Sequence, residues 1–159
     1  IPGHKLSSGA IFPALGLGTW YKFHLFMNTN FIARYNRTLK GKGCTESVKQ
    51  AYKLGYRLFD SAKMYGNEKE VGSSFNVTEA SQVLLTTKLH PADLGYASAK
   101  RAFQDSWELL THKTRPIDVY LIHWPGPWSS SPSDADKIRK TRRESWKALE
   151  ELYRQVSDQ

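Results

Sequence analysis

The chain has 159 residues, 40% of them apolar, which fits one folded domain with a core of ordinary size. Lysine and arginine number 23 against 15 acidic residues, giving a net charge of +8, and Cys44 is the only cysteine. A lone cysteine excludes an internal disulfide and a cysteine-based zinc cluster, and it favours a reducing, cytoplasmic setting. No apolar run reaches the roughly 18 residues of a membrane span, so we predict no membrane partner.

The N-terminal part of the chain predicts a hairpin followed by one strand and one helix. Residues 8–9 lie between two short stretches, 5–6 and 11–12, an arrangement typical of a β-hairpin. Residues 14–19 (ALGLGT) are apolar and bounded by glycine, and we interpret them as the first strand of a parallel sheet. Apolar residues at helical spacing then predict a helix over about 44–54.

Three further strands alternate with helical patterns, which indicates an α/β fold built from βαβ units. We predict these strands at residues 56–60, 83–89 and 117–123. The clearest helix covers 99–110, and a last amphipathic helix runs to about 156. The strand at 117–123 is almost continuously apolar, as expected of a strand covered on both faces. The count is four strand–helix units, half of a (β/α)8 TIM barrel.

Two segments depart from this alternation. Residues 21–43 contain aromatic, asparagine and basic residues without a sustained period, and this length is unusual for a loop in a compact domain. Residues 72–82 leave room for little more than one or two helical turns between two strands. We therefore interpret 21–43 as an atypical insert and 72–82 as a compressed helix.

Polar side chains end three of the predicted strands. Asp60, Lys88 and His123 each close an apolar run, and Tyr65 follows Asp60 after one short loop. Taken singly, each has an ordinary explanation, such as a turn residue, a solvated lysine, a packed histidine or a surface aromatic. Because barrel enzymes gather their catalytic groups at the carboxyl ends of the strands, the four together indicate an active site.

The motifs around these residues resemble those of the aldo-keto reductase family. In chain order they are LGLGTW (15–20), GYRLFD (55–60), YGNEKEVG (65–72), TKL (87–89) and DVYLIHWP (118–125). One such motif alone is weak, whereas all of them in this order are specific. The resemblance covers residues 5–20 and 44 to about 155 and stops after the fourth unit. We therefore interpret 1–159 as a single partial domain, a truncated N-terminal half-barrel with an insertion after Trp20.

The resemblance implies an NADP-dependent oxidoreductase that uses NADPH to reduce a small-molecule carbonyl substrate, an aldehyde or ketone, to the alcohol. By the same resemblance, the catalytic residues are Asp60, Tyr65, Lys88 and His123. The residues implied to bind the cofactor NADPH/NADP are Gly18, Thr19, Trp20 and Asp60. Those implied to line the substrate pocket are Trp20, Tyr65, His123 and Trp124. The resemblance implies no metal.

The chemistry of carbonyl reduction suits these four catalytic residues. Hydride delivery builds negative charge on the carbonyl oxygen, so Tyr65 would donate a proton there. An ammonium group beside the phenol favours its ionised form, and Asp60 would anchor and neutralise Lys88. His123 would donate a hydrogen bond to the same oxygen and orient the substrate.

Two alternatives to an active reductase stay open. In the family, the main contacts to the dinucleotide lie in the second half of the barrel, which the resemblance does not reach. The chain could then be an inactive fragment that associates through exposed sheet edges with itself, another half-barrel or a full-length relative. The net charge of +8 and the run KIRKTRR (137–143) suggest nucleic-acid binding as a second alternative. Basic residues elsewhere are scattered and zinc-finger spacing is absent, so we predict no nucleic-acid partner.

Overall fold

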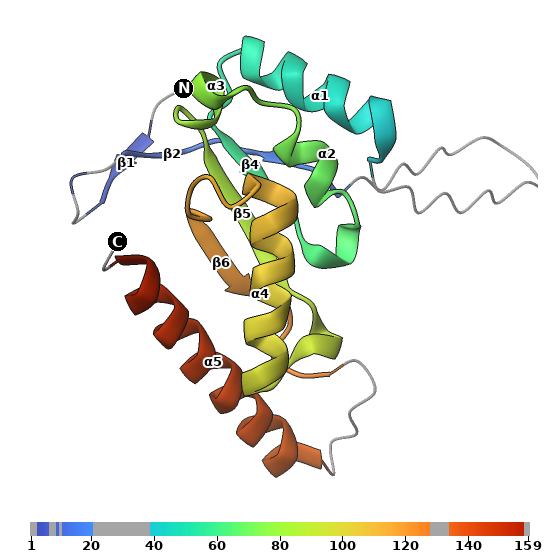
Figure 1. Cartoon of the computed structure of the whole chain (residues 1–159), viewed down its shortest axis with the longest axis vertical. Helices are drawn as coiled ribbons and strands as arrows, with labels where there is room; N and C mark the ends of the chain where they lie inside the picture. Colours follow the sequence, from blue (N-terminus) through green and yellow to red (C-terminus); the bar gives the residue numbers. More distant parts are fainter. Residues whose placement is uncertain (1–2, 7–8, 10, 21–38, 128–133, 158–159) are drawn as a thin grey trace, which may run out of the picture.

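The predicted parallel sheet forms the centre of the computed structural model, which describes residues 3–6, 9, 11–20, 39–127 and 134–157. Its four strands are hydrogen-bonded in the order β3-β4-β5-β6, and all neighbours are parallel (Figure 1). They are β3 (Leu17–Gly18), β4 (Leu58–Asp60), β5 (Leu84–Leu89) and β6 (Val119–Ile122). The result is the α/β half-barrel arrangement expected from the sequence.

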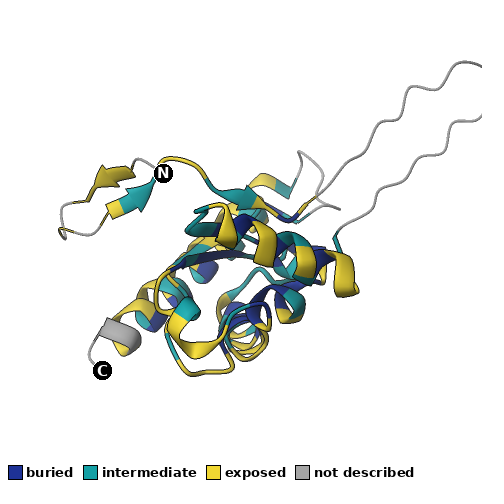
Figure 2. Cartoon of the chain, turned by 90° about the horizontal axis from the view of Figure 1, so that it is seen from above, coloured by how far each residue is buried: buried dark blue, intermediate teal, exposed yellow. Residues whose placement is uncertain are grey.

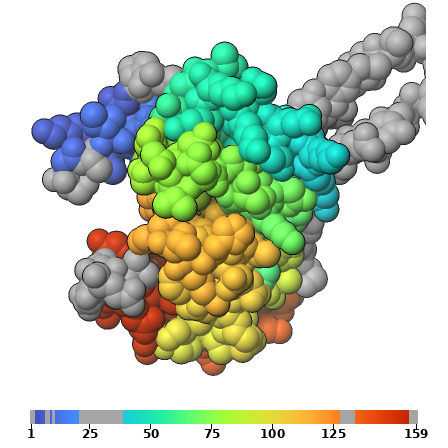
Figure 3. Space-filling model, turned by 45° about the horizontal axis from the view of Figure 1, so that its top comes forward, coloured from blue at the N-terminus to red at the C-terminus, as the bar shows by residue number. Residues whose placement is uncertain are grey.

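The predicted hairpin is a separate antiparallel pair ahead of the sheet. Its strands are β1 (Gly3–Lys5) and β2 (Ile11–Pro13). The pair stands out from the body of the molecule (Figure 2, Figure 3), and Ile11 is 67% exposed.

The helices flank the sheet and contribute many of the buried apolar residues. Among the described residues they are α1 (Gly41–Lys53), α2 (Glu68–Gly72), α3 (Val77–Ala80), α4 (Tyr96–Thr111) and α5 (Ala135–Ser157). Two 3-10 turns, η1 (Lys63–Tyr65) and η2 (Pro91–Asp93), follow β4 and β5. No helix in this part of the chain is long and apolar enough to cross a bilayer.

The core lies between the sheet and the helices. Successive strand residues point to opposite faces, so Phe59 and Leu85, which pair in register, both turn towards the helices. They belong to a buried cluster of Cys44, Val48, Ala51, Phe59, Val71, Val83, Leu85 and Leu110. A second cluster joins β5 to α4 and α5 through Leu89, Ala99, Ala102 and Ala148.

A close helix crossing fixes α2 beside the end of α4. A Cβ atom at Gly72 would run into the backbone carbonyl oxygens of Leu109 and Leu110. Only glycine fits at this contact, because it presents no side chain to the neighbouring backbone. This contact fixes the position of α2, which begins three residues after Tyr65, relative to α4 and the sheet.

Most element predictions are confirmed, with shifted ends. The strand predicted at 14–19 is reduced to Leu17–Gly18. The helix predicted from about 44 begins at Gly41, so its first turn includes residues 41–43 of the predicted insert. Glycines have low helix propensity, which hid this first turn. Residues 21–38 of the predicted insert lie outside the described residues. The compressed helix at 72–82 is α3, a single turn closed by a capping box between Asn76 and Glu79.

The expectation that the fourth predicted strand is covered on both faces is wrong. One face of β6 packs on a helix, since the Tyr120 ring lies 5.2 Å from the Phe103 ring of α4. The opposite face is open, and Leu121 is 44% exposed. The continuous run of apolar residues is typical of a strand that is buried on both faces. In β6, however, the described residues cover only the face that packs against the helices.

Candidate active site

Lys88 and Asp60 form an ion pair at the carboxyl ends of β5 and β4. Asp60 pairs in register with Thr86, and Lys88 lies two residues further along β5, so both side chains share one face of the sheet. The Lys88 Nζ lies 2.6 Å from Oδ1 and 2.7 Å from Oδ2 of Asp60, and it donates to the Ser61 carbonyl oxygen at 2.8 Å. Because the lysine side chain is only 13% exposed, three acceptors replace its lost water.

Tyr65 lies beside this ion pair at the end of the turn η1. The turn ends at Gly66, whose φ of 62° lies in the left-handed region that favours glycine. Tyr65 is 9% exposed, and its hydroxyl lies 3.5 Å from the Lys88 Nζ. The same Nζ lies 5.1 Å from the centre of the phenol ring. A positive charge thus stands next to the only acidic hydrogen of the side chain.

His123 approaches Tyr65 from the end of β6. Its backbone N–H donates to the Leu89 carbonyl oxygen at 3.3 Å and so continues the pairing of β6 with β5. The imidazole and phenol rings are 5.6 Å apart and nearly perpendicular. Burial, followed by the neighbouring Lys88 ammonium, lowers the pKa of His123 below its ordinary value. The imidazole is therefore neutral near pH 7, with one N–H available as a donor.

The end of β3 brings Trp20 to the same place. Gly18 pairs with Asp60, and the Thr19 backbone N–H donates to the Asp60 carbonyl oxygen at 2.9 Å. The Trp20 ring then lies 4.9 Å from the Tyr65 ring. A Cβ at Gly18 would meet no atom within 4 Å, so open space remains beside the carboxylate. The fold thereby brings together side chains that lie at or just beyond the ends of four different strands, namely Trp20, Asp60, Tyr65, Lys88 and His123.

Trp124 is the predicted pocket residue that is not drawn into the cluster. It follows His123 and is 57% exposed. Among the described residues, no ring contact joins it to Trp20, Tyr65 or His123.

Two residues that support the site were missed as functional residues by the sequence reasoning. The Ser61 carbonyl holds Lys88, and a backbone acceptor leaves no mark in the sequence. Asn67 is fully buried and bonds to Ser61 and Thr19. An asparagine at the start of a helix is ordinarily interpreted as a cap, which concealed its tertiary contacts.

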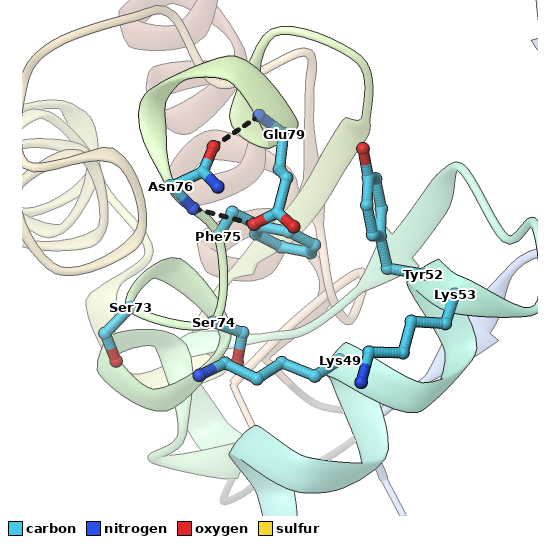
Figure 4. A pocket seen from close by; sticks show the side chains of 8 residues that line it. All are labelled: Lys49, Tyr52, Lys53, Ser73, Ser74, Phe75, Asn76 and Glu79. Atoms are coloured by element: carbon cyan, nitrogen blue, oxygen red, sulfur yellow. Dashed lines mark hydrogen bonds between the residues drawn. The ribbon is translucent and has the colours of Figure 1, made fainter.

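A separate hollow lies away from this cluster. It has a volume of about 420 Å³ and lies between α1 and the α2–α3 connection, with Lys49, Tyr52 and Phe75 in its wall (Figure 4). None of the predicted site residues lines it. The described residues also contain no group of three or more histidine, cysteine or acidic side chains that could hold a metal ion.

Comparison with known proteins gives one consistent family. The family model described as "Aldo/keto reductase family" matches residues 14–155. Glyoxal reductase of Bacillus subtilis is 34% identical over 152 residues, which cover 94% of this chain and 44% of that protein. The 9,11-endoperoxide prostaglandin H2 reductase of Trypanosoma cruzi is 35% identical, covering 89% of this chain and 40% of the relative. The chain thus spans less than half the length of these relatives.

Solved structures agree with the sequence comparison. An aldo/keto reductase from Brucella melitensis superposes with a TM-score of 0.70 at 31% identity, covering 98% of this chain and 50% of that structure. A mutant of Gox0644 solved in complex with NADPH gives a TM-score of 0.63 at 34% identity, over 98% of this chain and 45% of the other. With the strand-end cluster in place and the family match running over most of its length, the chain belongs to the aldo/keto reductase family.

Proposed function

We propose that the chain performs NADPH-dependent reduction of aldehydes or ketones, with Tyr65 as the proton donor. The observation that carries this proposal is the Lys88 ammonium, which is held by Asp60 and the Ser61 carbonyl and lies 3.5 Å from the Tyr65 hydroxyl. This arrangement stabilises the phenolate that remains after proton transfer.

The residues of the chain divide the proton chemistry between them. When bound, the reduced nicotinamide supplies the hydride that the carbonyl carbon accepts. The Tyr65 hydroxyl gives its proton to the carbonyl oxygen, and the Lys88 ammonium balances the phenolate charge. Neutral His123 donates its N–H to the same oxygen and fixes the direction of the carbonyl. Solvent then returns a proton to Tyr65.

The cofactor fits the carboxyl edge of β3 and β4. Open space at Gly18 lies beside the Asp60 carboxylate, and the exposed ring of Trp20 flanks it. Gly18, Thr19, Trp20 and Asp60 would hold the nicotinamide end of NADPH. The relative solved with NADPH supports a nicotinamide cofactor for this family.

Turnover with a paired tyrosine variant tests the proposal. Purified chain should oxidise NADPH in the presence of a simple aldehyde, and Tyr65→Phe should lower kcat by about 100-fold or more, the usual contribution of a positioned acid. Tyr52→Phe is the matched control, because its hydroxyl bonds Gln82 outside the site. Absence of NADPH binding in a fluorescence titration would count against the proposal.

A second candidate function is association without catalysis. Within the described residues, β3 and β6 each pair with one neighbour only, and Leu121 on the inner face of β6 is 44% exposed. Unpaired parallel edges and an open apolar face favour contact with a second copy or with another half-barrel. Sedimentation velocity should then show a dimer that Leu121→Lys dissociates. A monomer at all concentrations would remove this candidate.

A reducing, cytoplasmic setting is part of the same proposal. Cys44 is fully buried, and burial raises the pKa of its thiol to about 11. The thiol therefore stays protonated and unreactive, as a structural cysteine does.

A further inference from the structure

The side chain of Asn67 is fully buried where three segments of the chain meet around the site. Asn67 is the N-cap residue of α2, yet it makes no side-chain capping bond. An asparagine at this position normally accepts a hydrogen bond from the first turn of its own helix. Its carboxamide is used instead for contacts across the fold.

Four polar contacts surround the Asn67 carboxamide. Its Oδ1 accepts from the Ser61 hydroxyl at 2.7 Å and lies 3.5 Å from the Thr19 hydroxyl. Its Nδ2 donates to the carbonyl oxygens of Leu39 at 2.9 Å and Thr19 at 3.4 Å. Carbonyl oxygens only accept, so the NH2 group must face Leu39 and Thr19, and the chemistry fixes the orientation of the amide.

Two partners of this amide, Thr19 and Ser61, lead directly to parts of the site. Thr19 precedes Trp20, whose ring lies 4.9 Å from the Tyr65 ring. Ser61 supplies the carbonyl oxygen that accepts from the Lys88 ammonium at 2.8 Å. Thr19 and Leu39 also stand on either side of the stretch 21–38 along the chain, so a single NH2 group bonds to both of its flanks.

A second asparagine shows what an ordinary cap looks like in the same chain. Asn76 is exposed, and its Oδ1 accepts from the Glu79 backbone N–H at 2.9 Å in a capping box. The two asparagines, both at the start of a helix, thus make different kinds of hydrogen bond. Asn76 stabilises α3 locally, whereas Asn67 joins the ends of β3 and β4 to the chain that enters α1.

We propose that Asn67 is a positioning residue, which sets the placement of Trp20 and of the Lys88 acceptor Ser61 around Tyr65. Its carboxamide touches no reacting atom and acts through the Thr19 carbonyl and the Ser61 hydroxyl. Its effect on catalysis rests on the proposed reductase function, while its effect on the geometry of the site does not.

A fluorine probe on tryptophan tests the geometric part without any need for turnover. The chain has five tryptophans, so 5-fluorotryptophan labelling gives five 19F signals, which single Trp→Phe variants assign. Asn67→Ala should shift or broaden the Trp20 signal and leave that of Trp107 in place. Asn76→Ala, the matched control, should leave both signals unchanged.

The catalytic part is tested by steady-state kinetics on the same variants. If the chain turns over, Asn67→Ala should lower kcat by about 10-fold to 100-fold, the cost of a small misplacement, with KM altered far less. A variant that merely contained less folded protein would show the normal 19F position at reduced intensity. Lack of turnover in the wild type would defeat the proposed function and leave the 19F result to decide on Asn67.

A second substitution keeps the proposal open to refutation if Asn67→Ala does not fold. Asn67→Asp retains the shape and the acceptor for Ser61 but replaces the donor to Leu39 and Thr19 with an oxygen. It should move the Trp20 signal in the same way. An unmoved Trp20 signal, an equal movement in Asn76→Ala, or unfolding of both Asn67 variants would each overturn the proposal.

Discussion

Two polar clusters lie on opposite faces of the same strand, and they handle charge in different ways. Lys88 turns to the inner face of β5, where its ammonium meets the Asp60 carboxylate and the Tyr65 hydroxyl. Thr87, one residue earlier, turns to the outer face under the helices, where its hydroxyl donates to Glu68 at 2.6 Å. Two adjacent residues of β5 thus belong to two different clusters, an inner one with an ion pair and an outer one buried under the helices.

The outer cluster contains a carboxyl group, Glu68, that forms no ion pair among the described residues. Glu68 is 3% exposed, and no salt bridge reaches it among the described residues. Burial raises its pKa, which the Thr87 hydrogen bond only partly opposes. The hydroxyls of Ser106 and Tyr120 are buried nearby and make no hydrogen bond of ordinary geometry in the described part of the chain, although Ser106 lies close enough to Glu68 and Tyr120 to oppose the rise in both pKa values. Burial also raises the pKa of Tyr120, and the Glu68 charge adds to this effect.

The two clusters differ in their access to a ligand. The Lys88 ammonium and the Asp60 carboxylate of the inner cluster are paired with each other, and they face open space at Gly18. Burial raises the pKa values of Glu68 and Tyr120 in the outer cluster, which disfavours their charged forms, and helices cover this face of the sheet. The groups with raised pKa values are therefore not the accessible ones here, and the proposed proton donor, Tyr65, is chosen for its neighbours and its access.

The largest effect should follow removal of the counter-charge inside. Asp60→Asn deprives the Lys88 ammonium of its carboxylate. Breaking a fully buried pair costs about 3–5 kcal/mol. Because the Asp60 side chain is 34% exposed, solvent screening reduces the expected loss of unfolding free energy to about 1–2 kcal/mol. Urea unfolding measures this loss.

A surface ion pair provides the control for this variant. Lys63 bridges Asp93 and Asp105 at 3.2 Å and 3.1 Å, and the Asp105 side chain is 62% exposed. Asp105→Asn should change the unfolding free energy by less than about 0.5 kcal/mol. Equal losses in Asp60→Asn and Asp105→Asn would mean that the inner pair is no more than a surface contact.

Removal of the carboxyl group from the outer cluster should stabilise the protein, whereas removal of Asp60 should destabilise it. Since the pKa of Glu68 is raised, its contribution to stability is present below the ordinary value of 4.5 and is lost as pH rises through the folded pKa. The unfolding free energy of Glu68→Gln should therefore increase relative to that of the wild type as pH rises, by about 1 kcal/mol near neutrality. Thermal unfolding from pH 4 to pH 7 measures this difference.

The control for Glu68 is Glu46, an exposed residue of α1. Glu46→Gln should show no growing difference from the wild type across the same pH range. A constant offset in both variants would show that Glu68 is as well solvated as a surface carboxylate.

A smaller pH effect should come from His123. Its lowered pKa means that the unfolded chain takes up the proton first as pH falls below about 6.5. The folded state therefore loses stability as pH falls. The unfolding free energy of the wild type should decrease relative to that of His123→Asn between pH 7 and pH 5, by less than about 1 kcal/mol. Differential scanning calorimetry at matched ionic strength measures this change. Parallel curves for the two proteins would contradict a neutral imidazole.

The inner cluster was predictable from the sequence because strand ends leave a local mark. Apolar runs that stop at Asp60, Lys88 and His123 place three side chains at one edge of a parallel sheet, and alternation then decides the face. The structure brings these residues and Tyr65 within contact distance. The shortened β3 was less predictable, because glycines at 16 and 18 weaken the local strand signal.

The outer cluster and the Asn67 amide were not predictable in the same way. Ser106 follows the helical spacing of the buried face of α4, so the pattern correctly gives its burial but says nothing of its bonds. The partners of Asn67 at Thr19 and Leu39 lie 48 and 28 residues away in the chain. Periodicity reports which face is buried, while long-range polar pairing depends on how those faces meet.

The smallest expected effect is the sharpest test of whether the outer cluster is a connected network. The Tyr120 hydroxyl has no partner among the described residues, so Tyr120→Phe removes no hydrogen bond and should change the unfolding free energy by less than about 0.5 kcal/mol. The double variant with Glu68→Gln should then be additive within the same margin, as for independent groups. A loss above about 1 kcal/mol, or clear non-additivity, would mean that protonated Glu68 and the hydroxyls share bonds. In that case the outer cluster, like the inner one, would depend on pairing to remain buried.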